Sequence, residues 1–171
     1  MPKFQTVRHV AFAPDAMLEL VADVERYPEF LPLCESLKVL SRKREADGSE
    51  VIVARMGVGY GPIRESFTSR VQIARDRQHI LVTYLDGPFR RLVNTWSFRA
   101  TRGGCDVDFE IDYEFRSFAL QVLLGAMFDR AFRKFSEAFE TRARKVYGTR
   151  PDTAAVDKAR GPAAPALPSV P

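Results

Sequence analysis

The chain has 171 residues, of which 46% are hydrophobic and 28% are charged, which is enough to build one domain with a real core. The formal net charge of +4 comes from 26 basic residues spread among 22 acidic ones, a balance that permits contact with anionic lipid or RNA without indicating it. The N-terminus lacks a secretory signal, and the uncharged run 117–128 is shorter than the roughly 20 residues of a membrane span, so we expect a cytoplasmic protein without a transmembrane segment.

The first thirty or so residues predict one strand and two short helices. The strand covers 3–12. The first helix begins at Pro14, which suits a first helical turn, and Asp15 favours the positive end of that helix. The second helix is expected over 24–31.

Turn sequences then divide the middle of the chain into antiparallel strands. Asp-Gly at 47–48, Asp-Gly-Pro at 86–88 and Arg-Gly-Gly at 102–104 are hairpin signals between segments of high strand propensity. The six predicted strands cover 33–45, 49–57, 63–75, 78–86, 91–101 and 104–115. In the last of them apolar residues alternate with carboxylates without a break, which predicts an apolar inner face and an acidic outer face paired with basic residues of neighbouring strands.

A single long helix is predicted over 118–147. Ser117 is placed to cap it and Gly148 to end it. Apolar residues recur at three- and four-residue steps along one face. Gly125 inside this helix either lets another element approach closely or widens a cavity beneath it.

The outer face of this helix is basic. Arg130, Arg133 and Lys134 lie on it, either as an ordinary solvated face or as a surface for RNA or membrane. Beyond the domain 1–148, residues 149–171 are rich in proline and alanine and hold no aromatic residue. We expect them to be a disordered tail, with a peptide ligand for a partner protein as the alternative.

Three local groups have alternative interpretations. The rigid segment 27–34, with two prolines, either plugs one end of the sheet or forms a pocket rim. Asn94 shares its strand face with Trp96 and either binds a polar ligand group or satisfies a backbone group. The glycine-rich segment 57–62 leads into a strand rather than a helix, so we interpret it as a mobile loop and not as a phosphate-binding loop.

Signals for catalysis and metal binding are weak. The two cysteines, Cys34 and Cys105, and the two histidines, His9 and His79, are too widely separated for a ligand-like spacing, so we expect no metal, no disulfide and no required cofactor. Glu65 shares the parity of the apolar positions in its strand, but no nucleophile, base and orienting group can be assembled around it. We therefore expect a protein that is not an enzyme.

The predicted order of elements resembles the helix-grip fold of the START and polyketide-cyclase superfamily. Four motifs make the chain similar to the coenzyme Q-binding START family, whose bacterial members include the RatA-type ribosome-association toxins. They are YPEFLPLC at 27–34, DGPFRRLVNTWSF at 86–98, the strand ending YEF at 113–115, and FETRARKVYG at 139–148. The resemblance covers residues 1–148, and this chain has Leu33 where some members carry Trp.

The resemblance implies an α+β helix-grip fold, in which a seven-stranded antiparallel curved sheet wraps on a long C-terminal helix and two short helices separate the first two strands. It also implies a hydrophobic tunnel for ubiquinone or a similar polyprenyl lipid. Such a protein would support respiratory electron transport and could contact the inner membrane peripherally. For RatA-like members it implies binding to the large ribosomal subunit and inhibition of subunit association.

The candidate wall residues come from two sources. The family motifs imply Tyr27, Pro28, Phe30, Leu31, Pro32, Gly87, Pro88, Phe89 and Trp96. Strand parity and the helix stripe add Val53, Phe67, Val71, Phe98, Phe109, Ile111, Tyr113, Leu124, Met127, Phe128 and Ala131.

Three functional hypotheses follow from the sequence and the resemblance. The first is a lipid or quinone carrier, the second is a ribosome-binding inhibitor that uses the basic helix face, and the third is an enzyme of the polyketide cyclase or aromatase type. The first depends on the apolar wall residues and the second on Arg130, Arg133 and Lys134, so substitutions at the two sets would distinguish them.

Overall fold

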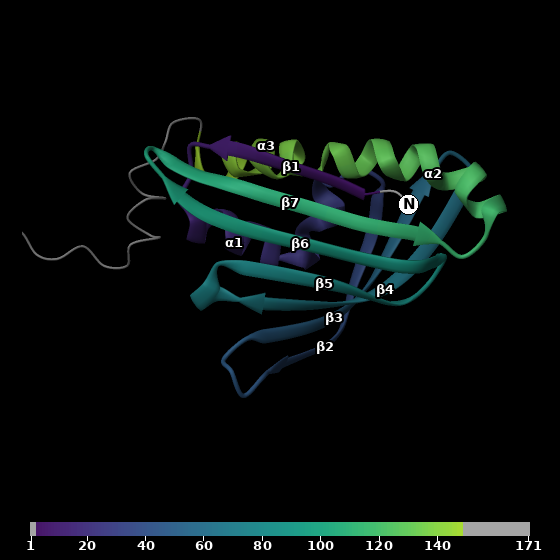
Figure 1. Cartoon of the computed structure of the whole chain (residues 1–171), viewed down its shortest axis with the longest axis horizontal. Helices are drawn as coiled ribbons and strands as arrows, with labels where there is room; N and C mark the ends of the chain where they lie inside the picture. The colour runs from purple at the N-terminus through teal and green to yellow at the C-terminus, as the bar shows by residue number, and fades with distance from the viewer. Residues whose placement is uncertain (1–2, 149–171) are drawn as a thin grey trace, which may run out of the picture.

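Seven antiparallel strands form one curved sheet in the order β1-β7-β6-β5-β4-β3-β2 (Figure 1). The computed structural model describes residues 3–148. The strands are β1 (Lys3–Val10), β2 (Cys34–Arg44), β3 (Glu50–Tyr60), β4 (Ile63–Ala74), β5 (His79–Asp86), β6 (Phe89–Thr101) and β7 (Gly104–Phe115). They correspond to the seven strands that the turn signals predict.

The helices complete a helix-grip fold, which confirms the predicted fold class. In Figure 1, α2 and α3 follow one another along the sheet, and α1 lies near one end of it. The helical segments are α1 (Pro14–Ala22), the 3-10 helix η1 (Val24–Glu29), the short 3-10 helix η2 (Arg75–Arg77), α2 (Phe118–Arg133) and α3 (Phe135–Tyr147). The predicted tail 149–171 lies outside the described residues.

The outer face of β7 carries the carboxylates, as its alternation predicts. Lys3 of β1 pairs with Glu110 at 2.9 Å, and Arg91 of β6 pairs with Asp112 at 2.8 Å. These half-exposed pairs lie across neighbouring strands and leave the inner face of β7 to buried side chains. The acidic side of this strand is therefore structural in character, and the apolar side faces the helices.

The predicted long helix is divided at Lys134, which corrects its extent. The Lys134 N–H donates to the Ala131 carbonyl at 3.0 Å, three residues back, and α3 resumes with the Ala138 N–H on the Lys134 carbonyl at 2.9 Å. A tight turn thus separates α2 from α3. The apolar stripe continues through the break, so the sequence pattern does not mark it.

The predicted ends of this helical region are confirmed. The Ser117 hydroxyl accepts the Leu120 N–H at 3.2 Å, and Gly148 follows α3 with a φ of +103°, a value that favours glycine. Gly125 is buried, and a Cβ placed on it would meet the side chain of Gln121 in the same helix. Gly125 is not among the residues that line the cavity described below, so it does not widen that cavity.

The glycine-rich segment 57–62 is mostly strand, not a mobile loop. β3 continues to Tyr60, where Gly59 pairs with Arg64 and Tyr60 with Ile63 of β4. Only Gly61 and Pro62 are left to make the turn, and the positive φ of Gly61, +58°, explains a glycine there. The hairpin is therefore long and carries Tyr60 to its tip.

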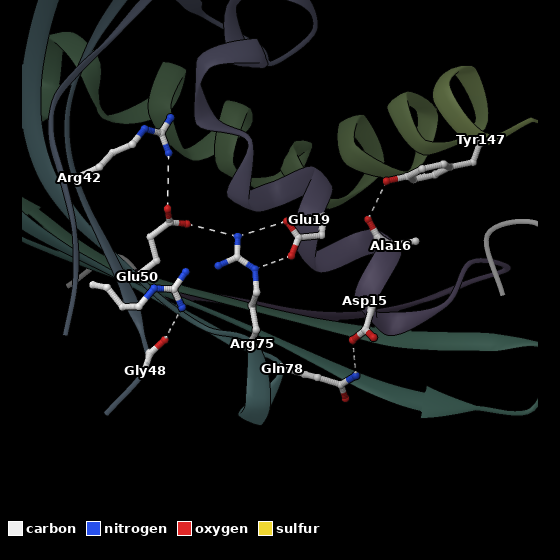
Figure 2. Close-up of polar contacts among 10 residues, drawn as sticks. Asp15, Ala16, Glu19, Arg42, Gly48, Glu50, Arg75, Gln78 and Tyr147 are labelled. Atoms are coloured by element: carbon white, nitrogen blue, oxygen red, sulfur yellow. Dashed lines mark hydrogen bonds and ion pairs between the residues drawn. The ribbon is translucent and has the colours of Figure 1, made fainter. Parts of the chain in front are cut away.

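Polar contacts fix α1 against the sheet and α3. Figure 2 shows Arg75 between Glu19 of α1 and Glu50 of β3, at 2.5 and 3.2 Å. The Tyr147 hydroxyl of α3 donates to the Ala16 carbonyl at 3.1 Å. This end of the molecule is thus joined by contacts that α2 does not share.

Candidate functional site: an apolar cavity and its groove

An apolar cavity lies between the inner face of the sheet and the C-terminal helices. Its volume is about 70 Å³, measured as space open to the centre of a water molecule. The lining comes from η1, the corner after it, six strands and both C-terminal helices. These residues are Val24, Tyr27, Pro32, Leu33, Leu37, Ala54, Met56, Val58, Phe67, Ser69, Val71, Val82, Leu92, Asn94, Trp96, Ile111, Phe128, Ala131, Phe132, Phe135 and Phe139.

The amide of Asn94 holds the indole of Trp96 at the cavity wall. The Trp96 Nε1–H donates to Asn94 Oδ1 at 2.9 Å, and Asn94 Nδ2 donates to the Glu110 carbonyl at 2.9 Å. Both residues are less than a tenth exposed. The amide therefore satisfies a backbone group, which was one of its two interpretations, and it also orients the single tryptophan of the chain.

Aromatic rings pack around this tryptophan. The ring centroids of Trp96 and Phe109 lie 4.7 Å apart, and those of Trp96 and Phe139 lie 5.1 Å apart. Tyr27 meets Phe139 edge-on at 5.4 Å, and its hydroxyl donates to the Val21 carbonyl. Burial raises the pKa of the Tyr27 hydroxyl, so this group stays protonated and its ring serves as an apolar wall.

The residue of the corner between η1 and β2 that lines the cavity beside Pro32 has a strained backbone. Leu33 has a φ of +68°, in the left-handed region that leucine seldom adopts, and its carbonyl accepts the Gly59 N–H at 3.0 Å. Pro32 precedes it and also lines the cavity. Of the two interpretations of segment 27–34, this position favours a pocket rim.

A groove of about 400 Å³, in the same measure, lies outside the cavity, between α2 and the tip of the β3–β4 hairpin. It shares Pro32, Leu33 and Ala131 with the cavity lining. The groove is lined by Pro32, Leu33, Tyr60, Ile63, Leu123, Ala126, Met127, Arg130, Ala131 and Lys134. The cavity and the groove therefore adjoin at the Leu33 corner and at Ala131 of α2.

Eight of the predicted wall residues line the cavity, and Met127 lines the groove. The eight are Tyr27, Pro32, Phe67, Val71, Trp96, Ile111, Phe128 and Ala131. Seven others are buried as ordinary core and do not line the cavity: Leu31, Pro88, Phe89, Phe98, Phe109, Tyr113 and Leu124. Gly87 is partly buried and lines neither the cavity nor the groove. Phe30 is partly buried and packs on Phe139 with ring centroids 5.1 Å apart.

Two predicted wall residues are placed elsewhere by the structure. Val53 pairs with Arg70 on the outer face, because the inward positions of β3 are its neighbours Ile52 and Ala54. Pro28 is exposed on η1. Both are corrections: the first arose from the parity assigned to β3, and the second from treating every residue of the corner as inward-facing.

Sequence reasoning missed several lining residues. Ala54, Met56 and Val58 alternate along β3, so choosing the other parity of that strand would have found them. Phe132, Phe135 and Phe139 belong to the helix stripe but were not selected from it. Ser69 shares the strand face of Phe67 and Val71, so the parity that selected those two would have found it as well.

The three basic residues predicted as one surface lie on different flanks of α2. Arg133 pairs with Asp129 at 3.0 Å, and its guanidinium stands 4.6 Å from the ring centroid of Phe4 in β1. Arg130 and Lys134 are exposed and line the groove instead. No ion pair within residues 3–148 involves either of these two side chains.

Comparisons with known proteins agree with this geometry. Residues 10–140 match the family described as polyketide cyclase / dehydrase and lipid transport. The ribosome association toxin RatA of Escherichia coli (strain K12) is 30% identical over 151 residues, covering 88% of this chain and 92% of the toxin. The mitochondrial coenzyme Q-binding protein COQ10 homolog B of Xenopus laevis is 31% identical over 144 residues, covering 81% of this chain and 57% of that protein.

A solved structure gives the same result for the fold. The solution structure of an 18 kDa protein from Caulobacter crescentus is 33% identical and has a TM-score of 0.70, covering 87% of this chain and all of that one (100%). No helix within residues 3–148 is long and apolar enough to cross a membrane. The chain belongs to the polyketide cyclase / dehydrase and lipid transport family, within the START superfamily that includes the RatA and coenzyme Q-binding proteins.

Proposed function

We propose that this protein binds ubiquinone or a related polyprenyl lipid without chemically changing it, and so supports respiratory electron transport. The observation that carries the proposal is the cavity, whose lining is almost wholly apolar and includes few polar side chains such as Ser69 and Asn94. Apolar walls with a few placed polar groups are typical of lipid and cofactor pockets. The name of the Xenopus relative, a coenzyme Q-binding protein, supports the same ligand class.

The size of the cavity sets a condition on this proposal. At about 70 Å³ it holds several water-sized groups, whereas pockets that enclose a drug-sized ligand are roughly 300–1,000 Å³. A prenylated quinone therefore requires the cavity and the groove to join. The residues that the two spaces share, Pro32, Leu33 and Ala131, would have to move apart.

Trp96 allows a direct test, because it is the only tryptophan and it lines the cavity. Titration with a short-chain ubiquinone is expected to quench its fluorescence and to saturate at one ligand per chain. Ala54→Leu adds bulk to the cavity wall and is expected to abolish the quenching while costing about 1–3 kcal/mol of stability. Val53→Leu changes the next residue, on the outer face, and is the matched control.

Quenching that Ala54→Leu and Val53→Leu leave equally intact would place the quinone elsewhere and contradict the proposal. Absence of saturable quenching in the unaltered protein would do the same. The family also includes cyclases, so the ligand recovered from the titration is to be checked for chemical change. If the protein alone converts the ligand to a product, its function is that of an enzyme and not of a carrier.

The second candidate is a ribosome-binding inhibitor of subunit association. Arg130 and Lys134 favour it, because both are exposed and neither pairs with an acid within residues 3–148. The E. coli relative is named for ribosome association. This function predicts salt-sensitive co-sedimentation with the large subunit, lost in Arg130→Glu/Lys134→Glu, with quinone quenching unchanged.

A further inference from the structure

The solvent-facing side of α2 is apolar over its first two turns. Phe118 is 83% exposed, Val122 is 68% exposed and Leu123 is 62% exposed. The opposite side of the helix places Leu124 and Phe128 in the core. A surface helix ordinarily carries charged residues on its outer side, so this helix is apolar on both sides where the groove begins.

Basic residues surround this apolar end. Arg116 directly precedes the Ser117 cap, and its carbonyl is 3.4 Å from Nη2 of Arg90. At the other end of the apolar stretch, Arg130 and Lys134 stand on the groove. The apolar side chains thus lie between two groups of cations.

Two of the carboxylates near these cations are paired with other arginines. Glu114 lies 3.8 Å from Arg90, and Asp129 forms an ion pair with Arg133 at 3.0 Å. Arg116, Arg130 and Lys134 themselves form no ion pair within residues 3–148, so their charges remain available to a partner. Anionic groups of a partner would find complementary charge here, while its apolar part would meet Phe118, Val122 and Leu123.

The same surface is continuous with the path to the cavity. Leu123 lines the groove, and Tyr60 lies across the groove from α2 and is 59% exposed. The groove in turn shares Leu33 and Ala131 with the cavity. A partner seated on this face would therefore cover the opening through which an apolar ligand must pass.

We propose that the N-terminal half of α2 docks on a bilayer that contains anionic phospholipid, with Phe118, Val122 and Leu123 entering the acyl region and the flanking cations meeting the phosphates. This combination of an apolar helical face and basic flanks is that of interfacial helices. The role of the docked state, transfer of ligand through the groove, rests on the proposed function. The docking itself does not.

The test is flotation of the full chain with vesicles of phosphatidylglycerol and phosphatidylcholine, against vesicles of phosphatidylcholine alone. Val122→Ser/Leu123→Ser is expected to lower partitioning by at least about tenfold, since two aliphatic side chains no longer enter the bilayer. The matched control is Val7→Ser/Leu40→Ser, which removes the same two residue types, also half-exposed, from β1 and β2. Arg130→Gln and Lys134→Gln are each expected to lower partitioning onto the anionic vesicles about fivefold and to leave partitioning onto phosphatidylcholine vesicles unchanged.

Two results overturn the docking face: no flotation of the unaltered protein, or equal losses in Val122→Ser/Leu123→Ser and its control. A switch from dimer to monomer in Val122→Ser/Leu123→Ser would assign the face to a second copy of the chain, and loss of ribosome co-sedimentation would assign it to the ribosome. Either also overturns the proposal. Trp96 quenching by a short-chain quinone in vesicle-free solution is measured on the same variants, so failure of ligand binding is seen separately from failure of docking.

Discussion

The most constrained residues of the site are those that pair with each other inside an apolar wall. The Asn94 amide accepts a hydrogen bond from the Trp96 indole and donates one to the Glu110 carbonyl, so it stabilises the structure in the absence of a ligand. Sequence parity places Asn94 and Trp96 on one face. It cannot show that they bond to each other, because residues two apart on a strand meet only when both side chains lean along it.

Asn94→Leu tests this stabilising role. It leaves the Trp96 N–H and the Glu110 carbonyl without their partner, and we expect a loss of about 1–3 kcal/mol in the free energy of unfolding. Urea denaturation followed by Trp96 fluorescence measures it. Ser97→Ala, on the exposed side of β6, is the control and is expected to change stability by less than about 0.5 kcal/mol; equal values for the two variants would contradict the assignment.

The two buried thiols make stability depend on alkaline pH. Burial raises the pKa of Cys34 from 9.0 to about 11 and that of Cys105 to about 12. Because the pKa of each thiol is higher in the folded state, the protonated thiols contribute to the free energy of unfolding. This contribution is fully present below about pH 9 and is lost as pH rises through 11 to 12. Unfolding measured at pH 8 and pH 10.5 is expected to show lower stability at the higher pH, with a smaller drop in Cys105→Ala; an unchanged drop would contradict the role of this thiol.

At the scale of elements, the sequence predicts the strands and helix ends well and the helix break poorly. Hairpin turns and caps are local and have their own chemistry, as at Ser117 and Gly148. The break at Lys134 contains no proline or glycine that would mark it in the sequence. Phe135, the first residue of α3, lines the cavity. Only the tertiary packing of both helices on the sheet determines the break.

Ser136, just after this break, offers a test of the packing. It is 5% exposed, and its hydroxyl has no hydrogen-bond partner within residues 3–148. Ser136→Ala removes an unpaired buried hydroxyl and is expected to raise the free energy of unfolding by about 1 kcal/mol. Ser49 is also buried but bonds to Asp47 at 2.6 Å, so Ser49→Ala is expected to lower it by a similar amount. Destabilisation in both would show that the Ser136 hydroxyl has a partner.

At the scale of the whole molecule, the predicted sheet, helices and curvature account for the walls of the site but not for its empty space. Phe109 and Trp96 have the same parity signal, yet Phe109 fills the core behind the wall and Trp96 faces the cavity. Whether neighbouring side chains fill a space depends on their rotamers and on the spacing of the elements. The alternation of residues along a strand determines neither. The family resemblance predicted a tunnel, and the structure has a small apolar cavity next to a larger groove.

We propose that the cavity and the groove together hold an isoprenoid quinone or a related lipid. The most direct test of this proposal is mass spectrometry of an organic extract from the full chain expressed in quinone-producing cells and purified without detergent, beside Ala54→Leu prepared in the same way. We expect a polyprenyl quinone or lipid in near-stoichiometric amount from the unaltered protein and little from Ala54→Leu. A consistently empty unaltered protein that co-sediments with ribosomes would contradict it.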